Sequence, residues 1–446
     1  METLMKAQTE TLADFRPLRA WRYDWSKFDA REVMAPPYDV ISPAAQDSLY
    51  QKSLYNCVRL ILNKIEEADT ETNNRYSRAR DCFQAWKKDG VLVRDDKPCF
   101  YIYRQSFKDP RNGRQHVRSA FLGALKLEPF ENQIVIPHER TLAKPRADRR
   151  RLLEATNTNF SPVFGLFEDP QSELVAMLED LTAGKPLFDI SDEENVTHTL
   201  WSVTDEKQMG RIRQSLSRQR IYIADGHHRY QTALEYSREK RAGARKDELQ
   251  PSDFIYMALV SFHDSGLILL PTHRLVTGLK DIDEESLIKA LEEFFDVSKV
   301  SQDEMGAALE KSPDQPSLIG LAFQNTAYLL ALRDAEKAKA RMLPGKPAVW
   351  YQLDVNLFAY LILKSVLGVP ESDWEAHLKF THSDGEALEA VKQGAVQAAF
   401  LLKPPNVRVL SDMGRVQELM PQKSTYFYPK LASGLLFYQH EENAVL

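Results

Sequence analysis

Histidines placed next to charged residues are the most informative feature of this 446-residue sequence, which contains ten histidines. Four compact groups hold half of them: His138-Glu139-Arg140, His227-His228-Arg229, Thr272-His273-Arg274 and Thr381-His382-Ser383-Asp384. Imidazole and guanidinium groups donate hydrogen bonds to anions, and imidazole also transfers protons near neutral pH. We therefore expect these groups to bind an anion, although chance juxtaposition of common loop residues stays open for any single one.

The segment from Arg220 to Arg229, RIYIADGHHR, has the sharpest pattern. A strand runs into a turn at Gly226, and a helix begins immediately after it. We expect Asp225 to cap this helix, because its carboxylate can accept the unpaired backbone N–H groups of the first turn. His227, His228 and Arg229 then lie on that turn, where the N–H groups and the helix dipole already favour an anion. A phosphoryl group fits such a place.

Two alternatives for this segment remain. The first is a metal site, which the geometry disfavours because adjacent helical residues point about 100° apart and seldom bind one ion. The sequence has no HExxH motif and no other histidine pair at helical i, i+4 spacing, so the metal ligands, if any, are unknown. The second alternative is a purely structural helix cap.

Two further basic segments are candidates for the same site. Residues 136–149 contain His138, Arg140 and Lys144, together with Glu139 as a potential general base. The alternative reading is a solvated basic turn that leads into a helix, and we prefer it for Arg146. Residues 420–430 contain three consecutive residues whose side chains could face phosphate. They supply one ammonium group and two hydroxyl groups, from Lys423, Ser424 and Thr425.

Several familiar nucleotide-binding and nucleophile motifs are missing from the sequence. It has no GxxxxGK[ST] phosphate loop, no GxGxxG motif after a strand and no GxSxG nucleophile motif. A nucleotide donor must therefore be held in another way, or the donor is a smaller phosphate compound.

The order of predicted elements indicates a mixed α/β (α+β) fold, with mixed sheets and flanking helices arranged in two or three lobes. A helix is expected from Thr70 to Lys88, and a β-hairpin from strands at 98–107 and 115–127 around the turn at 109–113. Strands at 163–167, 197–203 and 220–224 alternate with helices at 171–181, 206–219 and 228–241. We place soft boundaries near residues 130 and 280, which gives an N-terminal lobe (1–130), a catalytic core (131–280) and a C-terminal lobe (281–446).

Composition narrows the class of protein. The 58 basic and 64 acidic residues give a net charge of −6, which disfavours a general nucleic-acid-binding protein. Apolar stretches of about eight residues are too short for a membrane-spanning helix. The polar N-terminus has no apolar core of a signal peptide, and the three cysteines form no CxxC pair. We expect a cytoplasmic protein with reduced cysteines, and the sequence leaves open whether it is a homo-oligomer.

The motifs resemble those of known proteins. DGHHR at 225–229, after a strand and before a helix, is similar to the motif of free L-serine kinases, relatives of the ParB and sulfiredoxin group. From about residue 15 to 440 the chain resembles the family called domain of unknown function 1015. The motifs that carry this resemblance are APPYDVI (35–41), PHERTL (137–142), NFSP (159–162), IADGHHRY (223–230), LPTHRL (270–275) and MPQKST (420–425).

The resemblance implies a ParB/sulfiredoxin-like catalytic core and phosphoryl transfer between free L-serine, or O-phosphoserine, and a phosphate donor in serine metabolism. It also implies a requirement for Mg²⁺, which no dense carboxylate cluster in the sequence independently predicts. The motif residues that carry over are Asp225, His227, His228 and Arg229, and Glu139 is our candidate for the catalytic glutamate. Inorganic pyrophosphate is a plausible donor in the absence of a phosphate loop, and ADP or ATP is the alternative.

The charges of the side chains then suggest roles for the remaining candidate residues. The phosphoryl oxygens need positive groups and the attacking hydroxyl needs a base, which we expect to be Glu139. The residues expected to bind phosphate are His138, Arg140, Lys144, Gly226, Arg229, Lys423, Ser424 and Thr425. Thr272, His273 and Arg274 are expected to bind the substrate, with Arg274 at its carboxylate. Two other functions stay open: a nucleotide- or phosphate-sensing ParB-like regulatory protein, and a phosphoserine phosphatase.

Overall fold

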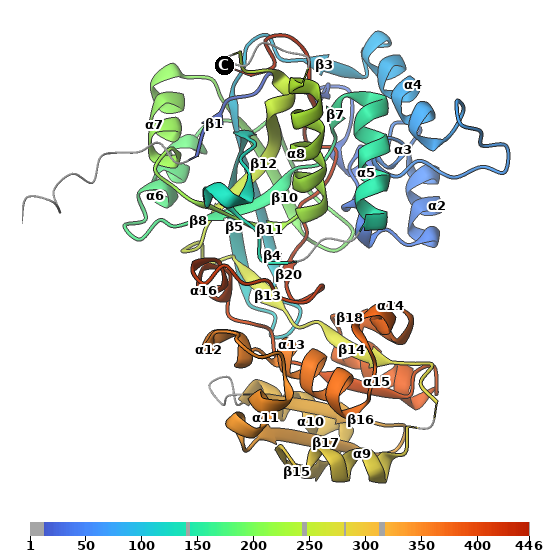
Figure 1. Ribbon diagram of the computed structural model, residues 1–446. Coiled ribbons are helices and arrows are strands. Elements are labelled where there is room, and N and C mark those ends of the chain that lie inside the picture. Colours follow the sequence, from blue (N-terminus) through green and yellow to red (C-terminus); the bar gives the residue numbers. More distant parts are fainter. Residues whose placement is uncertain (1–12, 140–142, 243–247, 281, 312–316, 446) are drawn as a thin grey trace, which may run out of the picture. The chain divides into compact units, whose positions relative to one another are not determined.

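The computed structural model describes residues 13–139, 143–242, 248–280, 282–311 and 317–445, and its contacts divide the chain into two compact units (Figure 1). Unit 1 comprises residues 1–137, 141–268 and 429–446, and unit 2 comprises residues 138–140 and 269–428. Each unit has a sheet with packed helices, which confirms the mixed α/β class. The boundaries predicted near residues 130 and 280 place β5 and β12 in different segments, whereas these strands are neighbours in the sheet of unit 1.

The sheet of unit 1 has nine strands among the described residues, in the order β6-β11-β8-β12-β5-β4-β10-β9, with β1 paired to β5. β11 and β6 are parallel, as are β12 and β8, and the remaining pairs are antiparallel, so the sheet is mixed. The strands are β1 (Phe15–Arg16), β4 (Phe100–Lys108), β5 (Gln115–Lys126), β6 (Val135–Ile136), β8 (Val163–Phe167), β9 (Phe188–Ser191), β10 (Thr197–Val203), β11 (Ile221–Asp225) and β12 (Phe254–Ser261).

The predicted β-hairpin is confirmed as β4 and β5, which pair from Lys108↔Gln115 to Tyr101↔Leu122. The turn between them contains Gly113 at φ +72°, a conformation that glycine adopts without steric cost. The Asp109 carboxylate accepts the backbone N–H of Arg111 and helps to close the turn.

Helices and short strands of unit 1 complete its fold. The predicted alternation after residue 160 is confirmed, with helices α6 (Glu173–Leu181), α7 (Glu206–Leu216) and α8 (His227–Arg241). The other elements are β2 (Trp21–Tyr23), β3 (Leu92–Arg94), β7 (Thr158–Asn159), β21 (Tyr438–Gln439), α1 (Ala30–Val33), α2 (Pro43–Lys52), α3 (Val58–Ile61), α4 (Arg75–Lys88), α5 (Ala143–Thr156) and the 3₁₀ turns η2 (Tyr38–Val40), η3 (Phe130–Asn132) and η4 (Pro251–Asp253). α5 packs between α4 and α8.

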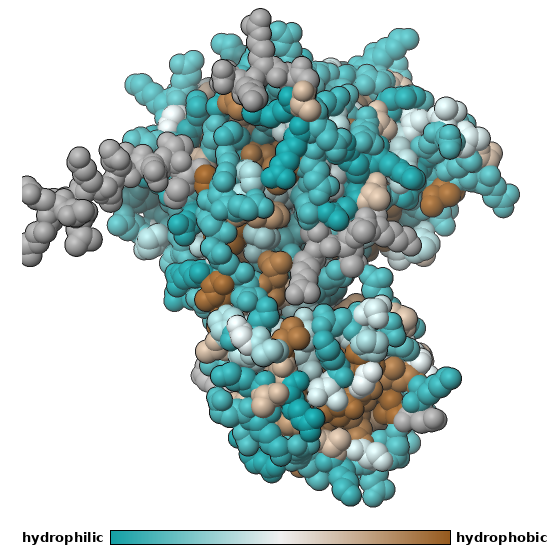
Figure 2. Space-filling model, viewed as in Figure 1, coloured by the Kyte–Doolittle hydropathy of each residue, from teal (hydrophilic) through white to brown (hydrophobic). Residues whose placement is uncertain are grey.

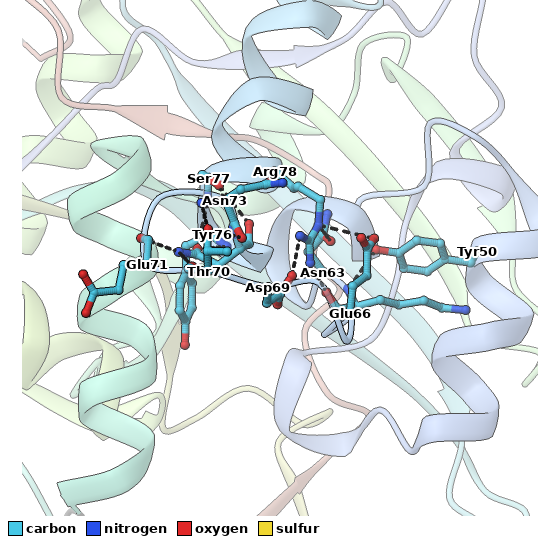
Figure 3. A network of polar contacts seen from close by, with 12 residues as sticks. Tyr50, Asn63, Glu66, Asp69, Thr70, Glu71, Asn73, Tyr76, Ser77 and Arg78 are labelled. Atoms are coloured by element: carbon cyan, nitrogen blue, oxygen red, sulfur yellow. Dashed lines mark hydrogen bonds and ion pairs between the residues drawn. The ribbon is translucent and has the colours of Figure 1, made fainter.

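Helix α4 begins five residues later than predicted, at Arg75 instead of Thr70. Asn74 takes the N-cap position: its side chain accepts the N–H groups of Tyr76 and Ser77, and Ser77 Oγ accepts the Asn74 N–H in return. Such a reciprocal box satisfies the unpaired donors of the first turn and sets where the helix begins. The preceding residues form a loop instead, which Arg78 holds through Asp69 Oδ1 at 2.5 Å and the Lys64 carbonyl at 2.8 Å (Figure 3).

The C-terminal segment returns to the core of unit 1. Phe437 packs against Tyr23, Phe83 and Phe160 with ring centroids 5.6–5.9 Å apart, and all four side chains are buried. Burial of such rings removes a large apolar area from water, at about 25 cal/mol per Å². β21 pairs with β7, so the chain end is tied to the segment just before β8.

The sheet of unit 2 is antiparallel, in the order β15-β17-β16-β19-β14-β18. α10 packs on β16 and β17, and α15 packs on β14, β18 and β19, over a core that includes Met305, Val391 and Leu401. The elements are β13 (Ile268–Leu270), β14 (His273–Val276), β15 (Phe295–Val300), β16 (Leu318–Ala322), β17 (Ala327–Leu332), β18 (Leu378–Thr381), β19 (Ala398–Leu401), β20 (Tyr426–Tyr428), α9 (Glu284–Leu291), α10 (Gln302–Lys311), α11 (Ala335–Arg341), α12 (Ala348–Tyr351), α13 (Asp354–Asn356), the π-helical η5 (Leu357–Val366), η6 (Glu371–Asp373), α14 (Trp374–His377), α15 (Asp384–Lys392) and α16 (Val409–Arg415).

The surface is largely hydrophilic in the view of Figure 2, where apolar residues gather on one side of unit 2. Within the described ranges, no helix combines the length and the apolar character needed to cross a bilayer. The three cysteines, Cys57, Cys82 and Cys99, are free, and burial raises the pKa values of the Cys82 and Cys99 thiols to about 12.

Candidate active site

The turn between β11 and α8 builds the first cluster, in unit 1. Gly226 has φ +90°, and a Cβ atom there would lie 2.9 Å from Arg229 Nη2. Glycine is therefore required both for the backbone conformation and for the guanidinium to fold back over the turn. Gly226 also takes the N-cap position, so the expectation that Asp225 caps the helix is wrong. Because Gly226 has no Cβ, it can adopt the left-handed conformation that starts α8.

The Asp225 carboxylate pairs with two cations. Arg229 Nη2 lies 3.3 Å from Oδ2, and Lys430 Nζ lies 3.5 Å from Oδ1. Arg229 Nη1 also donates to the Pro162 carbonyl, which orients the guanidinium. These three charged side chains are mostly buried, so their charges are screened less than surface charges. Among the described residues, two cations thus face one carboxylate, an arrangement that can attract an anion.

The two histidines of the motif lie on the first turn of α8, as the sequence predicts. His227 is buried and His228 is half-buried. The N-cap residue, Gly226, has no side chain to cap this helix end, and the positive end of the helix dipole adds to the charge of Arg229 and Lys430.

Lys430 is a residue that the sequence analysis did not select. Its backbone carbonyl accepts Gln105 Nε2 at 3.0 Å, and Gln105 Oε1 accepts Arg118 Nη2 at 2.5 Å. Arg118 also donates to the Pro429 carbonyl and is fully buried, which lowers its pKa to about 10. The hairpin β4–β5 thus holds the segment around Pro429 and Lys430 in a position from which the Lys430 side chain reaches Asp225. The only feature of the sequence that pointed to Lys430 as a site residue was its position in the basic stretch 420–430.

A recess of about 480 Å³, counting the solvent at its mouth, lies beside this cluster in unit 1. Arg229 and Thr232 of α8 line it, together with Arg149 of α5 and Tyr38. The Arg149 guanidinium lies 3.8 Å from the centre of the Tyr38 ring. Burial raises the pKa of the Tyr38 hydroxyl to about 12, and the neighbouring Arg149 opposes this rise.

Polar contacts from α5 and α3 fix Arg149. Asp148 Oδ2 accepts Arg149 Nε at 2.8 Å, and Asp148 Oδ1 accepts the Tyr76 hydroxyl at 2.7 Å. Tyr76 belongs to the network that closes the loop before α4 (Figure 3). Arg149 Nη1 donates to the Ile61 carbonyl at 2.9 Å. The guanidinium is therefore held in one orientation.

The second cluster lies in unit 2, where the turn after Met420 binds the Glu139 carboxylate. Glu139 Oε1 accepts the backbone N–H groups of Ser424 at 3.0 Å and Thr425 at 3.4 Å. His138 Nε2 lies 2.9 Å from Thr425 Oγ1, and the His138 carbonyl accepts the Met420 N–H at 2.8 Å. The sequence predicted that these residues share one site, and the structure brings them together. The Ser424 hydroxyl donates to the Pro421 carbonyl and its N–H to Glu139, so both of its donors are engaged.

Arg274 joins the same cluster through Lys423. Arg274 Nη2 donates to the Lys423 carbonyl at 3.0 Å, and Nη1 donates to the Thr272 carbonyl. Burial lowers the pKa of Arg274 to about 10, an effect that the negative charge of Glu139 opposes. Lys423 adopts a left-handed φ of +57°, and its side chain is exposed.

His273 is held inside the fold of unit 2. Its Nε2 lies 2.7 Å from Asp384 Oδ1, and its Nδ1 accepts the Leu402 N–H at 3.2 Å, which places the ring proton on Nε2. Both nitrogens are engaged, so its assignment to substrate stays a prediction. Thr272 Oγ1 lies 3.4 Å from His382 Nδ1.

Two predicted site residues lie outside this description. Arg140 falls among the residues that the structure does not describe, and the side chain of Lys144 is likewise not described. Gly226 and Arg229 belong to the cluster of unit 1, whereas Glu139, Arg274, Lys423 and the two residues after it belong to that of unit 2. Convergence of all these segments on one anion stays a prediction.

The described residues do not form a protein-built magnesium cage. Among them, no three side chains of His, Cys, Asp or Glu are arranged to hold a metal ion. Asp225 is paired with two cations and Glu139 Oε1 with backbone N–H groups, which makes both carboxylates weak candidates for Mg²⁺ ligands. Mg²⁺ often binds through phosphate oxygens and water with few protein ligands, and we assign it no step here.

Solved structures similar to the chain include a free serine kinase in complex with AMP, with 13% identity, coverage of 66% of this chain and 83% of that chain, and a TM-score of 0.33. A conserved hypothetical protein from Pyrococcus furiosus has 12% identity and covers 67% and 89%, at a TM-score of 0.33. SbnI with C-terminal truncation from Staphylococcus aureus has 11% identity and covers 70% and 85%, also at 0.33. Similarity at this TM-score is too low to carry a functional argument.

The comparison with curated proteins found no significant match. A family model, in contrast, matches residues 15–356, which include all the motifs from APPYDVI to LPTHRL. The chain therefore belongs to the family described as Protein of unknown function (DUF1015), which confirms the resemblance of its motifs.

Proposed function

We propose that the chain is a phosphotransferase that moves a phosphoryl group between a phosphate donor and the hydroxyl group of a small acceptor, with free L-serine as the first candidate. The observation that carries the proposal is the cluster at the start of α8. There Arg229 and Lys430 both approach Asp225, beside two histidines at the N-terminus of α8, whose N-cap residue is Gly226.

The chemistry follows from the charges. In the transfer, a bond forms between the acceptor oxygen and phosphorus, and the bond from phosphorus to the leaving oxygen of the donor breaks. Negative charge on the transferred oxygens is stabilised by Arg229, Lys430 and the N–H groups at the start of α8. His227 and His228 donate further hydrogen bonds or a proton to the leaving oxygen.

Glu139 is the proposed base that takes the proton of the acceptor hydroxyl. The backbone N–H groups of Ser424 and Thr425 hold its carboxylate in one orientation, as a general base requires. Lys423 is exposed on the same turn and is the proposed second cation for the donor. Arg274 is the proposed partner of an acceptor carboxylate.

The test is a transfer assay with the full chain, L-serine and one donor at a time: inorganic pyrophosphate, ADP or ATP, each with and without Mg²⁺. Phosphorus NMR should show O-phosphoserine growing as one of the donors is consumed. O-phosphoserine incubated alone is the control, because release of phosphate from it identifies a phosphatase. Binding of DNA that weakens with salt, without any transfer, would instead favour the sensor function.

A further inference from the structure

One face of the unit 1 sheet carries buried polar side chains next to the segment that contains Lys430. Tyr103 and Gln105 lie two positions apart on β4, and His198 of β10 lies opposite Gln105. Alternate residues of a strand share a face, as do residues directly opposite each other, so these three side chains point to the same side. Tyr103 and His198 are only 1% and 4% exposed. Gln105 binds the Lys430 carbonyl, whereas the other two have no role in the proposed transfer.

A chain of hydrogen bonds runs through this face from Asp192 to Ala432. Asp192 Oδ2 lies 2.9 Å from His198 Nε2, and His198 Nδ1 lies 2.5 Å from the Tyr103 hydroxyl oxygen. The same oxygen accepts the backbone N–H of Ala432. Ala432 follows Lys430 by two residues, so the chain of hydrogen bonds holds the segment that carries the Lys430 side chain.

The chemistry of the partners sets the direction of each hydrogen bond. A carboxylate only accepts, so the ring proton of His198 lies on Nε2 and points to Asp192. Nδ1 then carries a lone pair and accepts the Tyr103 proton. Burial raises the pKa of the Tyr103 hydroxyl well above its ordinary value, so the hydroxyl keeps that proton. With its proton directed at His198, the Tyr103 oxygen presents a lone pair to the Ala432 N–H.

The Asp192 carboxylate is itself fixed by the backbone. Its Oδ1 accepts the N–H groups of Glu194 and Val196, both at 2.9 Å, in the turn between β9 and β10. Its Oδ2 is the oxygen that faces the imidazole of His198. Because both oxygens are engaged, the carboxylate presents an acceptor to Nε2 in one orientation, and this selects one tautomer of the ring.

We propose that Asp192 and His198 are positioning residues for Lys430. The carboxylate fixes the imidazole tautomer, and the tautomer directs the Tyr103 hydroxyl so that its oxygen holds the segment of Lys430. The inference rests on the proposed function and deepens it, because it names the groups that set the position of the Lys430 ammonium group. A shift of about 1 Å in a catalytic group can cost about 100-fold in rate, so a remote contact of this kind affects turnover.

Asp192→Asn tests the tautomer in the full chain. The amide oxygen can replace Oδ1 at the two backbone N–H groups, which turns the NH₂ group toward His198 Nε2. Nε2 must then accept, the ring proton moves to Nδ1, and the Tyr103 proton loses its acceptor. Nitrogen NMR of the imidazole should show the proton on Nε2 in the unchanged protein and on Nδ1 in the variant. Asp189→Asn is the matched control, because its side-chain oxygen can still accept the Thr199 hydroxyl. The unchanged tautomer in Asp192→Asn would overturn the proposal.

Acetylation of lysine side chains, followed by mass spectrometry, reports the position of Lys430 without any transfer assay. Its side chain is 12% exposed and its Nζ lies 3.5 Å from Asp225 Oδ1, so it should react slowly in the unchanged protein. The rate should rise about tenfold in Asp192→Asn and in Tyr103→Phe, because loss of one hydrogen bond changes a local opening equilibrium by about that factor. The exposed Lys379 is the reference in each sample. Unchanged rates in both variants would likewise exclude the positioning role.

The transfer assay distinguishes positioning from a general loss of stability. Asp192→Asn and Tyr103→Phe should each lower kcat about tenfold and leave KM for the acceptor unchanged. In a Lys430→Met background, Asp192→Asn should change the rate less than about twofold, because the group that it positions is gone. An equal loss in both backgrounds would overturn the positioning role and leave the phosphotransferase in place. If no donor yields a product, the proposed function fails, and the NMR and acetylation results still decide whether Asp192 and His198 position Lys430.

Discussion

Lys430 Nζ lies 3.5 Å from Asp225 Oδ1, although the two residues are far apart in the sequence. Arg229 occupies the other oxygen of the same carboxylate. Asp225 thus holds two cations in place at the start of α8, where the proposed phosphate group would meet both of them. This relationship links the DGHHR motif to the C-terminal segment of unit 1.

Lys430→Met should lower the rate of phosphoryl transfer about 100-fold, because loss of one preorganised charged donor costs about that much in comparable sites. The melting temperature should change little, since Arg229 still pairs with Asp225. Lys430→Arg restores the charge and should recover part of the rate. Lys379→Met, which changes an exposed lysine of unit 2, is the control. A transfer rate in Lys430→Met equal to that of the unchanged protein would remove Lys430 from the site.

Gln105→Leu should destabilise the protein by about 1–3 kcal/mol, because it leaves the buried Arg118 without one of its acceptors. It also releases the Lys430 carbonyl, so the transfer rate should fall while the affinity for the acceptor stays the same. Urea unfolding measures the first effect and steady-state kinetics the second. A loss of stability with an unchanged rate would show that Gln105 does not position Lys430.

Glu139→Gln should lower transfer at least about 100-fold if this carboxylate is the base. The amide oxygen can still accept the N–H groups of Ser424 and Thr425, so folding and ligand binding should be retained. Circular dichroism and calorimetry check the fold and the binding. Unchanged turnover in this variant excludes Glu139 as the base, whatever its effect on stability.

His440 should make the protein less stable in mild acid. Its two ring nitrogens are buried beside Tyr236 and Tyr438 and have no hydrogen-bond partner among the described residues, and burial lowers its pKa to about 4. The unfolded chain, with the ordinary pKa near 6.5, binds the proton more readily. The free energy of unfolding should therefore be highest above about pH 6.5 and fall by up to about 3 kcal/mol as the pH drops toward 4.

His440→Phe isolates this effect, because it keeps an aromatic ring between the two tyrosines and removes the titrating group. Urea unfolding at pH 7 and pH 4.5 should show a smaller acid loss in the variant than in the unchanged protein. Equal losses in the two proteins would contradict the pKa shift of His440. Other groups titrate in both proteins, so their contribution cancels in the comparison.

Local patterns predicted most secondary structure correctly, for reasons that act over a few residues. The turn-forming residues around Gly113 mark the β4–β5 hairpin, and the run from Ile221 to Arg241 shows a buried strand followed by a helix. The start of α4 was misjudged, because the cap at Asn74 competes with helix propensity in the preceding residues.

In the candidate site, too, local motifs predicted some residues correctly and could not predict others. Sequence motifs selected His138, Glu139 and Thr425 as members of one cluster, and the structure brings them together. Lys430 could not be selected, because its role depends on Gln105 and Arg118 of a hairpin far away in the chain.

The amino-acid sequence by itself determined the family, the mixed α/β class and the motifs with the chemistry of phosphate binding. These depend on residue type and spacing, which act locally. Only the tertiary structure decided that Lys430 meets Asp225 and that Arg149 lies over Tyr38. Those contacts form because distant segments bury their apolar side chains against one sheet, and the pattern within one segment does not say which other segment it will meet.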